Sequence, residues 1–175
     1  MEKTSSSKLR IQEASDQDAG ILSGLIRLSY QDVARQFNLT RENCPKHPSN
    51  CADDWIKKDL DRGVVYYLLF KEGVPAGCVA MEESDSQTCY LERLAVLPEF
   101  RHNGLGKKLV SYILDMAGKK DINTVSIGII AEQEILRNWY ETLGFVYVET
   151  KKFDHLPFQV GFMKIDLRGT PQVQM

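Results

Sequence analysis

A pair of glycines joins a strand-like segment to a helix-like one in the middle of this chain. The apolar run Tyr90–Leu97 is typical of a strand, and it ends before Pro98. Apolar residues then recur at helical spacing over Leu105–Met116. Gly104 and Gly106 therefore fall at the first turn of the helix, where free backbone N–H groups and the helix dipole favour an anion. Because glycine has no Cβ, a phosphate can approach this backbone closely, although a simple tight turn would show the same glycines.

Two motifs in this order resemble those of a known enzyme family. The run Val96–Gly106, which reads VLPEFRHNGLG, is similar to the acetyl-CoA pyrophosphate loop of the GNAT superfamily of acyl-CoA-dependent N-acetyltransferases. Further along, Asn138–Phe145 resembles the family's Tyr-Glu-x-x-Gly-Phe segment, with Tyr140 late in a helix and Gly144 at its C-terminal cap. Two ordered motifs are far more specific than one.

The resemblance extends in element order from about Leu9 to Leu167, and it implies a fold and a cofactor. The implied fold is α/β, with a GNAT-like mixed, mostly antiparallel sheet of about six to seven strands, four flanking helices and a V-shaped cofactor cleft. Acetyl-CoA is the implied cosubstrate. The residues expected to hold it are Leu94, Ala95, Val96, Arg101, His102, Asn103, Gly104, Leu105, Gly106, Lys107, Gln133 and Tyr140. The chain departs from the family pattern at Gln133, where an Asn is common, and at His102 and Asn103, but neither change removes a backbone donor.

Acetyl transfer to an amine requires a group that takes a proton from the amine, whose pKa in a lysine-like side chain is about 10.4. Glu92 is the first candidate, because some members of the family carry a catalytic glutamate at about this place on the strand before the loop. Tyr90 shares its strand face by the period of two, so both are expected at the acceptor. The alternative for Glu92 is a surface or salt-bridged glutamate, and Glu82 and Glu83 are reserve candidates for the base.

The departing thiolate requires a proton donor, and the resemblance implies that Tyr140 supplies it. A backbone N–H group near Leu94–Val96 is expected to polarise the thioester carbonyl. The alternative is that Trp139, Tyr140 and Phe145 are core aromatic residues at a junction between helix and strand. The spacing of Gly144 and Phe145 from the tyrosine favours the functional interpretation.

The segment Asn43–Cys51 places two thiols on either side of an imidazole, in the order Cys44, His47 and Cys51. These groups could ligate zinc, but a structural zinc site needs a further ligand, and Asp53 is the nearest oxygen. A rigid, capped turn in which Ser49 or Asn50 starts the helix containing Trp55 is therefore favoured, and no metal is expected. The resemblance places this region at a wall of the acceptor pocket, so His47 is expected to shape acceptor choice.

Hydrophobic periodicity and turn residues predict the remaining elements. A helix capped by Ser15 is expected to run to about Asn38, and a short helix containing Trp55 is expected to end by Gly63. A last helix is predicted over Gln133–Leu143. The predicted strands are Leu9–Glu13, Val64–Phe70, Val74–Met81, Tyr90–Leu97, Thr124–Ile130, Phe145–Thr150 and Gln159–Leu167.

Composition excludes several classes of protein. The 175 residues fit one domain, expected over residues 8–167, with a disordered end at 1–7 and a flexible tail at 168–175. A net charge of -2 disfavours nucleic acid as a partner, and no segment approaches the ~20 apolar residues of a membrane span. The polar N-terminal end is unlike a secretion signal, and the 4 cysteines fit reduced core thiols, so a cytoplasmic location is expected.

The sequence thus predicts an N-acetyltransferase that moves an acetyl group directly from acetyl-CoA to a primary amine of a small-molecule acceptor. The first alternative is a non-catalytic CoA-binding or regulatory module of the same fold. The second is a metal-binding interaction domain around Cys44, His47 and Cys51. The family resemblance also makes a homodimer through the last strands an option, and it leaves the identity of the acceptor open.

Overall fold

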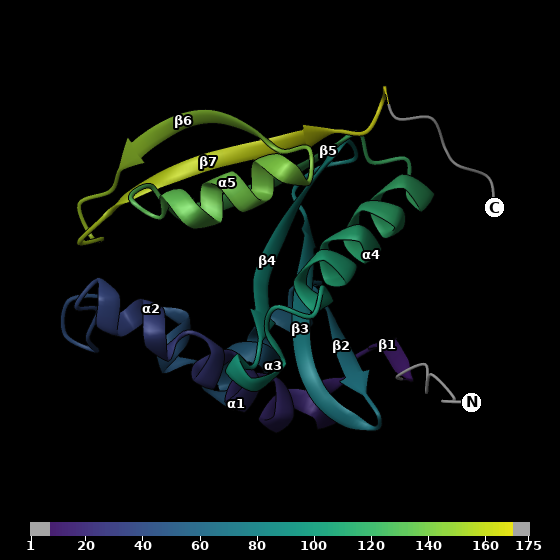
Figure 1. Ribbon diagram of the computed structural model, residues 1–175, viewed down its shortest axis with the longest axis horizontal. Helices are drawn as coiled ribbons and strands as arrows, with labels where there is room; N and C mark the ends of the chain where they lie inside the picture. Colours follow the sequence, from purple (N-terminus) through teal and green to yellow (C-terminus); the bar gives the residue numbers. More distant parts are fainter. Residues whose placement is uncertain (1–7, 170–175) are drawn as a thin grey trace, which may run out of the picture.

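A seven-stranded sheet forms the centre of the molecule, in the order β1-β2-β3-β4-β5-β7-β6 (Figure 1). This computed structural model describes residues 8–169, so the end predicted to be disordered and most of the predicted tail lie outside the described residues. The strands are β1 (Leu9–Glu13), β2 (Val65–Lys71), β3 (Val74–Glu83), β4 (Thr88–Val96), β5 (Thr124–Ile130), β6 (Val146–Lys152) and β7 (Gln159–Asp166). All neighbouring strands are antiparallel except β4 and β5, which pair in parallel.

Helices lie on both faces of this sheet. They are α1 (Ala19–Ser29), α2 (Gln31–Gln36), α3 (Asp53–Asp61), α4 (Leu105–Lys119) and α5 (Glu134–Thr142). The predicted fold class is therefore confirmed, and the predicted strands agree with the observed ones to within about two residues. Within residues 8–169, no helix combines the length and the apolar character that crossing a membrane requires.

The first helix is broken, whereas the sequence predicted one helix from the Ser15 cap to about Asn38. Ser15 instead caps a short 3-10 turn, Asp16–Asp18, in a capping box with Asp18, and α1 follows directly. The backbone then leaves helical geometry at Tyr30, with φ -101° and ψ 4°. The Tyr30 hydroxyl donates a hydrogen bond of 2.9 Å to the Leu94 carbonyl of β4. This long-range contact stabilises the break, and helix periodicity alone does not reveal it.

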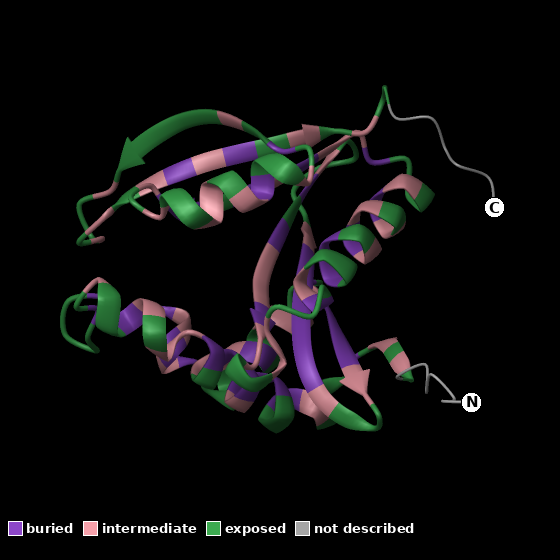
Figure 2. Ribbon diagram, viewed as in Figure 1, coloured by how far each residue is buried: buried purple, intermediate pink, exposed green. Residues whose placement is uncertain are grey.

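The alternation of side chains along the strands builds two hydrophobic clusters, one on each face of the sheet. Figure 2 shows that buried residues dominate the middle of β3, whereas β6 is mostly exposed. On β2, Tyr66 and Leu68 pack with α1 and α3, whereas Tyr67 and Leu69 lie in the cluster formed with α4. The cysteines are all buried and free, as predicted for reduced core thiols: Cys44, Cys51, Cys78 and Cys89.

The sheet splits between β4 and β5. The two strands pair only from Thr88↔Thr124 to Tyr90↔Ser126. Beyond Tyr90, β4 continues beside β3, while β5 continues beside β7, so the two halves of the sheet diverge (Figure 1). The β4 segment Leu91–Val96 therefore has no partner strand on its β5 side. Its backbone is available to an extended ligand that lies along it.

Candidate functional site

A cleft of about 1350 Å³ occupies the space where β4 and β5 separate. Its walls come from the α1–α2 bend, β4, the glycine loop, α5, β5 and β7. Ligand pockets usually measure about 300–1,000 Å³, so this cleft has room for a large cofactor together with an acceptor. The predicted site residues that line it are His47, Tyr90, Glu92, Leu94, Ala95, Val96, Arg101, His102, Gly104, Leu105, Gly106, Lys107, Gln133 and Tyr140.

Asn103 is the predicted site residue that does not line the cleft. Its amide group donates hydrogen bonds to the Phe100 and Arg101 carbonyls at 3.3 and 3.1 Å, inside the loop. Asn103 therefore fixes the shape of the loop through its side chain, and its expected cofactor contact is left to the backbone N–H group.

The glycine loop presents free donors at the start of α4. Gly104 is the N-cap, with φ 76°, a conformation that strongly favours glycine. No residue from 8 to 169 accepts a hydrogen bond from the backbone N–H groups of His102–Lys107, and the first closed turn is the bond from Lys108 to the Gly104 carbonyl at 3.1 Å. Consecutive free N–H groups at a helix N-terminus fit the pyrophosphate of a CoA cofactor.

Close packing against α5 explains why the second residue of the pair, Gly106, is a glycine. A Cβ atom at Gly106 would lie 3.3 Å from the Trp139 ring of α5, which is closer than most side-chain contacts. Gly106 therefore allows α4 and α5 to approach at the cleft, where the cofactor is expected.

The Arg101 guanidinium, predicted to add charge for the pyrophosphate, is engaged by the protein. It donates to the Val96 carbonyl at 3.1 Å, to the Ser29 carbonyl at 2.7 Å and to the Asp32 carboxylate at 2.6 Å. The ion pair keeps the pKa of Asp32 below its ordinary value, although partial burial opposes it. These contacts tie the loop to the α1–α2 bend and give Arg101 a positioning role. Direct contact between Arg101 and the cofactor stays a prediction.

A β-bulge in β4 places two opposite charges on one face of the sheet. The register with β3 shifts between Cys78↔Ala95 and Ala80↔Glu92, and Arg93 adopts a positive φ of 52°. The extra residue breaks the usual alternation of side chains. Glu92 and Arg93 consequently both face the side of α1 and α3, where Ala95 also packs. Sequence reasoning did not identify Arg93, because the period-two alternation of a regular strand would place it on the face opposite Glu92.

Glu92 lines the cleft and is half-buried. Burial, assisted by the negative charge of Glu82, raises the pKa of the Glu92 carboxyl group above its ordinary value. Within the described part of the chain, the Glu92 carboxylate forms neither a salt bridge nor a side-chain hydrogen bond. A carboxylate with a raised pKa is a better proton acceptor than an exposed one.

Tyr140 combines a core ring with an accessible hydroxyl group. The residue is 5% exposed, and its ring packs edge-to-face with Trp139 and Phe145 at centroid distances of 4.9 and 5.3 Å. Among residues 8–169, only the Ser29 hydroxyl is both fully buried and without a hydrogen-bond partner. The Tyr140 hydroxyl, which also has no protein partner, therefore keeps contact with the cleft that it lines. Burial raises its pKa, so it holds its proton at neutral pH.

His47 is buried against the α1–α2 bend, at the wall expected for the acceptor. Its Nδ1 accepts a hydrogen bond of 3.3 Å from the Ser49 backbone N–H and lies 2.8 Å from the Ser49 hydroxyl. It caps the 3-10 turn Pro48–Asn50, so a rigid turn forms as expected. The expectation that Ser49 or Asn50 starts the next helix is wrong, because the N-cap of α3 is Ala52 and no side chain caps it. No cluster of three or more potential metal ligands occurs between residues 8 and 169. Tyr30, which sequence reasoning missed, packs edge-to-face on His47 at 5.9 Å.

His47 gives the protein a pH-dependent stability. Burial and the positive charge of Arg93 lower the pKa of His47 from 6.5 to about 4. Below pH 6.5 the unfolded chain takes up a proton that the folded chain takes up only near pH 4. The stability that neutral His47 provides is thus complete above pH 6.5 and falls as the pH drops to about 4, by up to about 3 kcal/mol.

Urea unfolding at pH 7.5 and 4.5 measures this loss, with His47→Asn as the comparison because asparagine can keep the cap. We expect the variant to lose less stability between the two pH values than the unmodified protein. An equal loss in both proteins would show that His47 does not carry the effect.

Comparison with known proteins gives consistent matches. The model of the acetyltransferase (GNAT) family matches residues 30–145. N-alpha-acetyltransferase 50 of Danio rerio is 25% identical over 118 residues, which cover 65% of this chain and 70% of that protein. The ribosomal-protein-S18-alanine N-acetyltransferase of Escherichia coli has a TM-score of 0.74 at 13% identity, covering 96% of this chain and 99% of that one. The PaiA N-acetyltransferase of Thermoplasma acidophilum, solved in complex with coenzyme A, has a TM-score of 0.70 at 17% identity, with coverages of 91% and 99%.

Proposed function

Since this chain belongs to the acetyltransferase (GNAT) family, we propose that it transfers an acetyl group from acetyl-CoA directly to the primary amine of a small-molecule acceptor. Membership of the family confirms the fold class and the acyltransferase class predicted from the sequence. The observation that carries the proposal is the run of free N–H groups over His102–Lys107, which shares one cleft with the accessible hydroxyl group of Tyr140.

The donor would lie along the diverging edge of β4. The free N–H groups of the glycine loop would hold its pyrophosphate, and the unpaired β4 segment Leu91–Val96 would hold its extended arm. A structural relative with a TM-score of 0.70 was solved with coenzyme A, which supports this class of cofactor. Acetyl-CoA supplies an activated thioester, and the groups of the protein do the remaining work.

Three groups divide that work. Glu92 accepts the proton of the acceptor amine, either directly or through water, because its raised pKa makes it a stronger base than an exposed carboxylate. A backbone N–H group of Leu94–Val96 donates to the carbonyl oxygen as negative charge develops there. The Tyr140 hydroxyl, which has no competing partner in the protein, donates its proton to the departing thiolate.

A small acceptor is favoured by a cluster of apolar residues that joins the two walls of the cleft. Ala34 of α2, Leu39 and Cys44 pack in one buried cluster with Ile130 at the end of β5. Leu156 and Phe158, from the β6–β7 connection, and Val33 and Phe37 of the α2 segment pack against it. This bridge narrows the opening through which an acceptor enters.

The relative named N-alpha-acetyltransferase 50 favours a second candidate, the N-terminal amine of a polypeptide. A panel of polyamines, amino acids, aminoglycosides and N-terminal peptides separates the candidates when thiol release from acetyl-CoA is followed beside a titration with CoA. Thiol release in the presence of small amines but not of peptides supports the proposal. Thiol release in the presence of peptides but not of small amines supports the second candidate. CoA binding without release for any amine would favour the non-catalytic module instead.

We expect Glu92→Gln to lower kcat/KM by about 100-fold, because the amide has no proton-accepting oxygen of comparable basicity. The acid limb of the wild-type pH profile should lie above the ordinary carboxyl range, since the pKa of Glu92 is raised, and it should vanish in the variant. Glu149→Gln, on β6 outside the cleft, is the matched control. An unchanged pH profile in Glu92→Gln would remove Glu92 from the role of base.

A further inference from the structure

Arg93 carries a positive charge that forms no salt bridge with any described residue. It lines the cleft and is half-buried, and its Cζ lies 5.9 Å from the centre of the Trp55 ring. Within residues 8–169 its guanidinium forms no salt bridge and no hydrogen bond, although its backbone carbonyl accepts a weak one from Cys78 Sγ at 3.6 Å. A half-buried cation whose close partner is only an aromatic ring has lost water without gaining a counter-charge, so an anion that enters the cleft would stabilise it.

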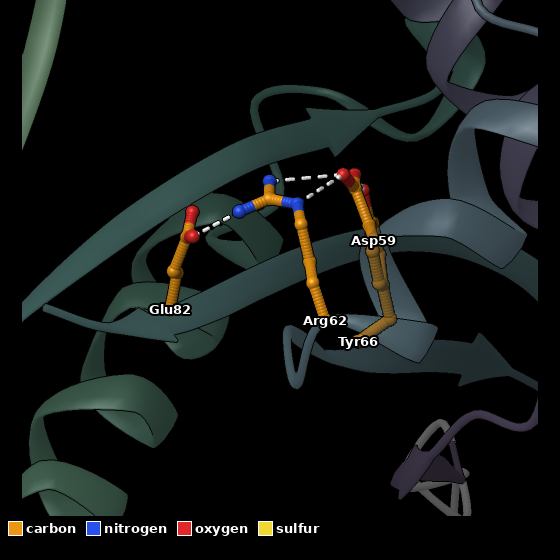
Figure 3. A network of polar contacts seen from close by, with 4 residues as sticks. All are labelled: Asp59, Arg62, Tyr66 and Glu82. Atoms are coloured by element: carbon orange, nitrogen blue, oxygen red, sulfur yellow. Dashed lines mark hydrogen bonds and ion pairs between the residues drawn. The ribbon is translucent and has the colours of Figure 1, made fainter.

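The nearby carboxylates are committed to another arginine. Arg62 contacts both Asp59 and Glu82, and Asp59 also accepts a hydrogen bond of 2.6 Å from the Tyr66 hydroxyl (Figure 3). The Nη2–Oδ1 distance between Arg62 and Asp59 is 2.9 Å. This network engages Asp59 and Glu82, and among the described residues it leaves Glu92 as an unpaired carboxylate on that face of the sheet. It leaves Arg93 as the cation available to an incoming anion.

The bulge sets Arg93 directly beside Glu92 on one face of β4, and the two side chains form no ion pair with each other. An amine acceptor that approaches Glu92 therefore brings its neighbouring atoms to Arg93. An acceptor that carries a carboxylate close to its amine would match this pair of charges. Its carboxylate would accept two parallel hydrogen bonds from the planar guanidinium of Arg93.

We propose that the acceptor is an amino acid or a similar small amine that carries a carboxylate, and that Arg93 binds this carboxylate while Glu92 faces the amine. The inference rests on the proposed acetyl transfer and specifies its substrate class. It makes Arg93 a residue that determines specificity and leaves the chemical step to Glu92 and Tyr140.

The test compares acceptors that differ only in the carboxylate. Thiol release from acetyl-CoA is measured for the common amino acids and for their α-carboxamides, with the wild-type protein and with Arg93→Met, Arg93→Lys and Arg137→Met. Arg137 lies on α5, pairs with Glu141 at 3.0 Å and does not line the cleft, so Arg137→Met is the matched control. CoA titration and thermal unfolding accompany each variant to show that fold and donor site are intact.

We expect the wild type to prefer the carboxylates, and Arg93→Met to lower their kcat/KM by about 10- to 100-fold while the carboxamides change little. The kcat/KM of Arg93→Lys for the carboxylates should lie between those of the wild type and Arg93→Met, because lysine keeps the positive charge but cannot donate two parallel hydrogen bonds. Equal use of both forms by the wild type, or an equal loss for both in Arg93→Met, would overturn the inference. If Arg93→Met does not fold, two other measurements test the inference. They are the wild-type ratio of kcat/KM for amino acids to kcat/KM for their carboxamides, and the change of that ratio in Arg93→Lys.

The experiment distinguishes a failure of this inference from a failure of the proposed function. Thiol release with carboxamides or simple amines, without a preference for carboxylates, would leave the acetyltransferase in place and remove the role of Arg93. Absence of release with every amine, despite CoA binding, would instead remove the proposed function on which the inference rests.

Discussion

Replacing Gly104 by glutamate is expected to weaken CoA binding by about 100-fold or more. Gly104 is the N-cap of α4, in the middle of the run of free N–H groups. A glutamate there would add bulk and a negative charge where the pyrophosphate is expected, and charge-assisted hydrogen bonds worth about 1.5–3 kcal/mol each would be lost. Apart from Gly104 and its two chain neighbours, no atom of residues 8–169 lies within 4 Å of the position that a Cβ would take, so the substitution should act on the ligand more than on packing.

Two matched variants separate the causes. Gly104→Ala introduces the strain of a side chain at φ 76° without much bulk, and Gly104→Gln has nearly the shape of the glutamate without its charge. All three should lose a similar stability of about 1–2 kcal/mol, because they share the backbone strain. Titration with CoA should then rank the loss of affinity as Ala, then Gln, then Glu. Undiminished affinity in Gly104→Glu would show that the loop does not hold the pyrophosphate.

Features decided by local chemistry could be predicted from the sequence. The short gap between the predicted strands Val64–Phe70 and Val74–Met81 is an example, because Glu72 and Gly73 close it with φ values of 52° and 82°, as a two-residue hairpin loop requires. The helix after Gly104 is another, since its buried residues recur at helical spacing. In both cases the deciding interactions lie within a few residues along the chain.

Features decided by distant contacts could not be predicted. The break at Tyr30 depends on a hydrogen bond to Leu94, which is 64 positions away in the sequence. The contacts of Arg101 likewise depend on Asp32, 69 positions away. The family motif identified Arg101 as part of the cofactor loop, but only the folded chain shows that its guanidinium is engaged with the α1–α2 bend. Arg93 belongs with these residues, because its place on the face of Glu92 follows from a shift in register with β3.

Removing one hydroxyl group, in Tyr140→Phe, is expected to lower kcat by about 100-fold or more while the KM for acetyl-CoA changes little. The ring would keep its contacts with Trp139 and Phe145, so the helix and the following strand should pack as before. Since the hydroxyl has no partner in the described protein, its removal leaves no donor or acceptor unsatisfied. Stability should consequently stay within about 0.5 kcal/mol of the wild type. A large effect on turnover with no effect on folding would assign the hydroxyl to the reaction.

Tyr147→Phe is the matched control for this experiment. Tyr147 lies on β6, its hydroxyl contacts Thr150, and it does not line the cleft. The same chemical change there should leave kcat unchanged. Steady-state thiol release for both variants, beside titration with CoA, distinguishes a catalytic hydroxyl from a structural one. Unchanged turnover in Tyr140→Phe would remove Tyr140 from the mechanism and return it to the core residues with which it packs.

The same pair of variants bears on the choice between an enzyme and a module that only binds CoA. Burial raises the pKa of Tyr140, and the phenol is therefore neutral at physiological pH in an enzyme and in a binding module alike. The kinetics of the variants separate the two, because a proton donor acts only when the thiolate forms, after the cofactor has bound. If turnover falls in Tyr140→Phe while CoA affinity is kept, the hydroxyl acts after binding, which is a role that a binding module does not have.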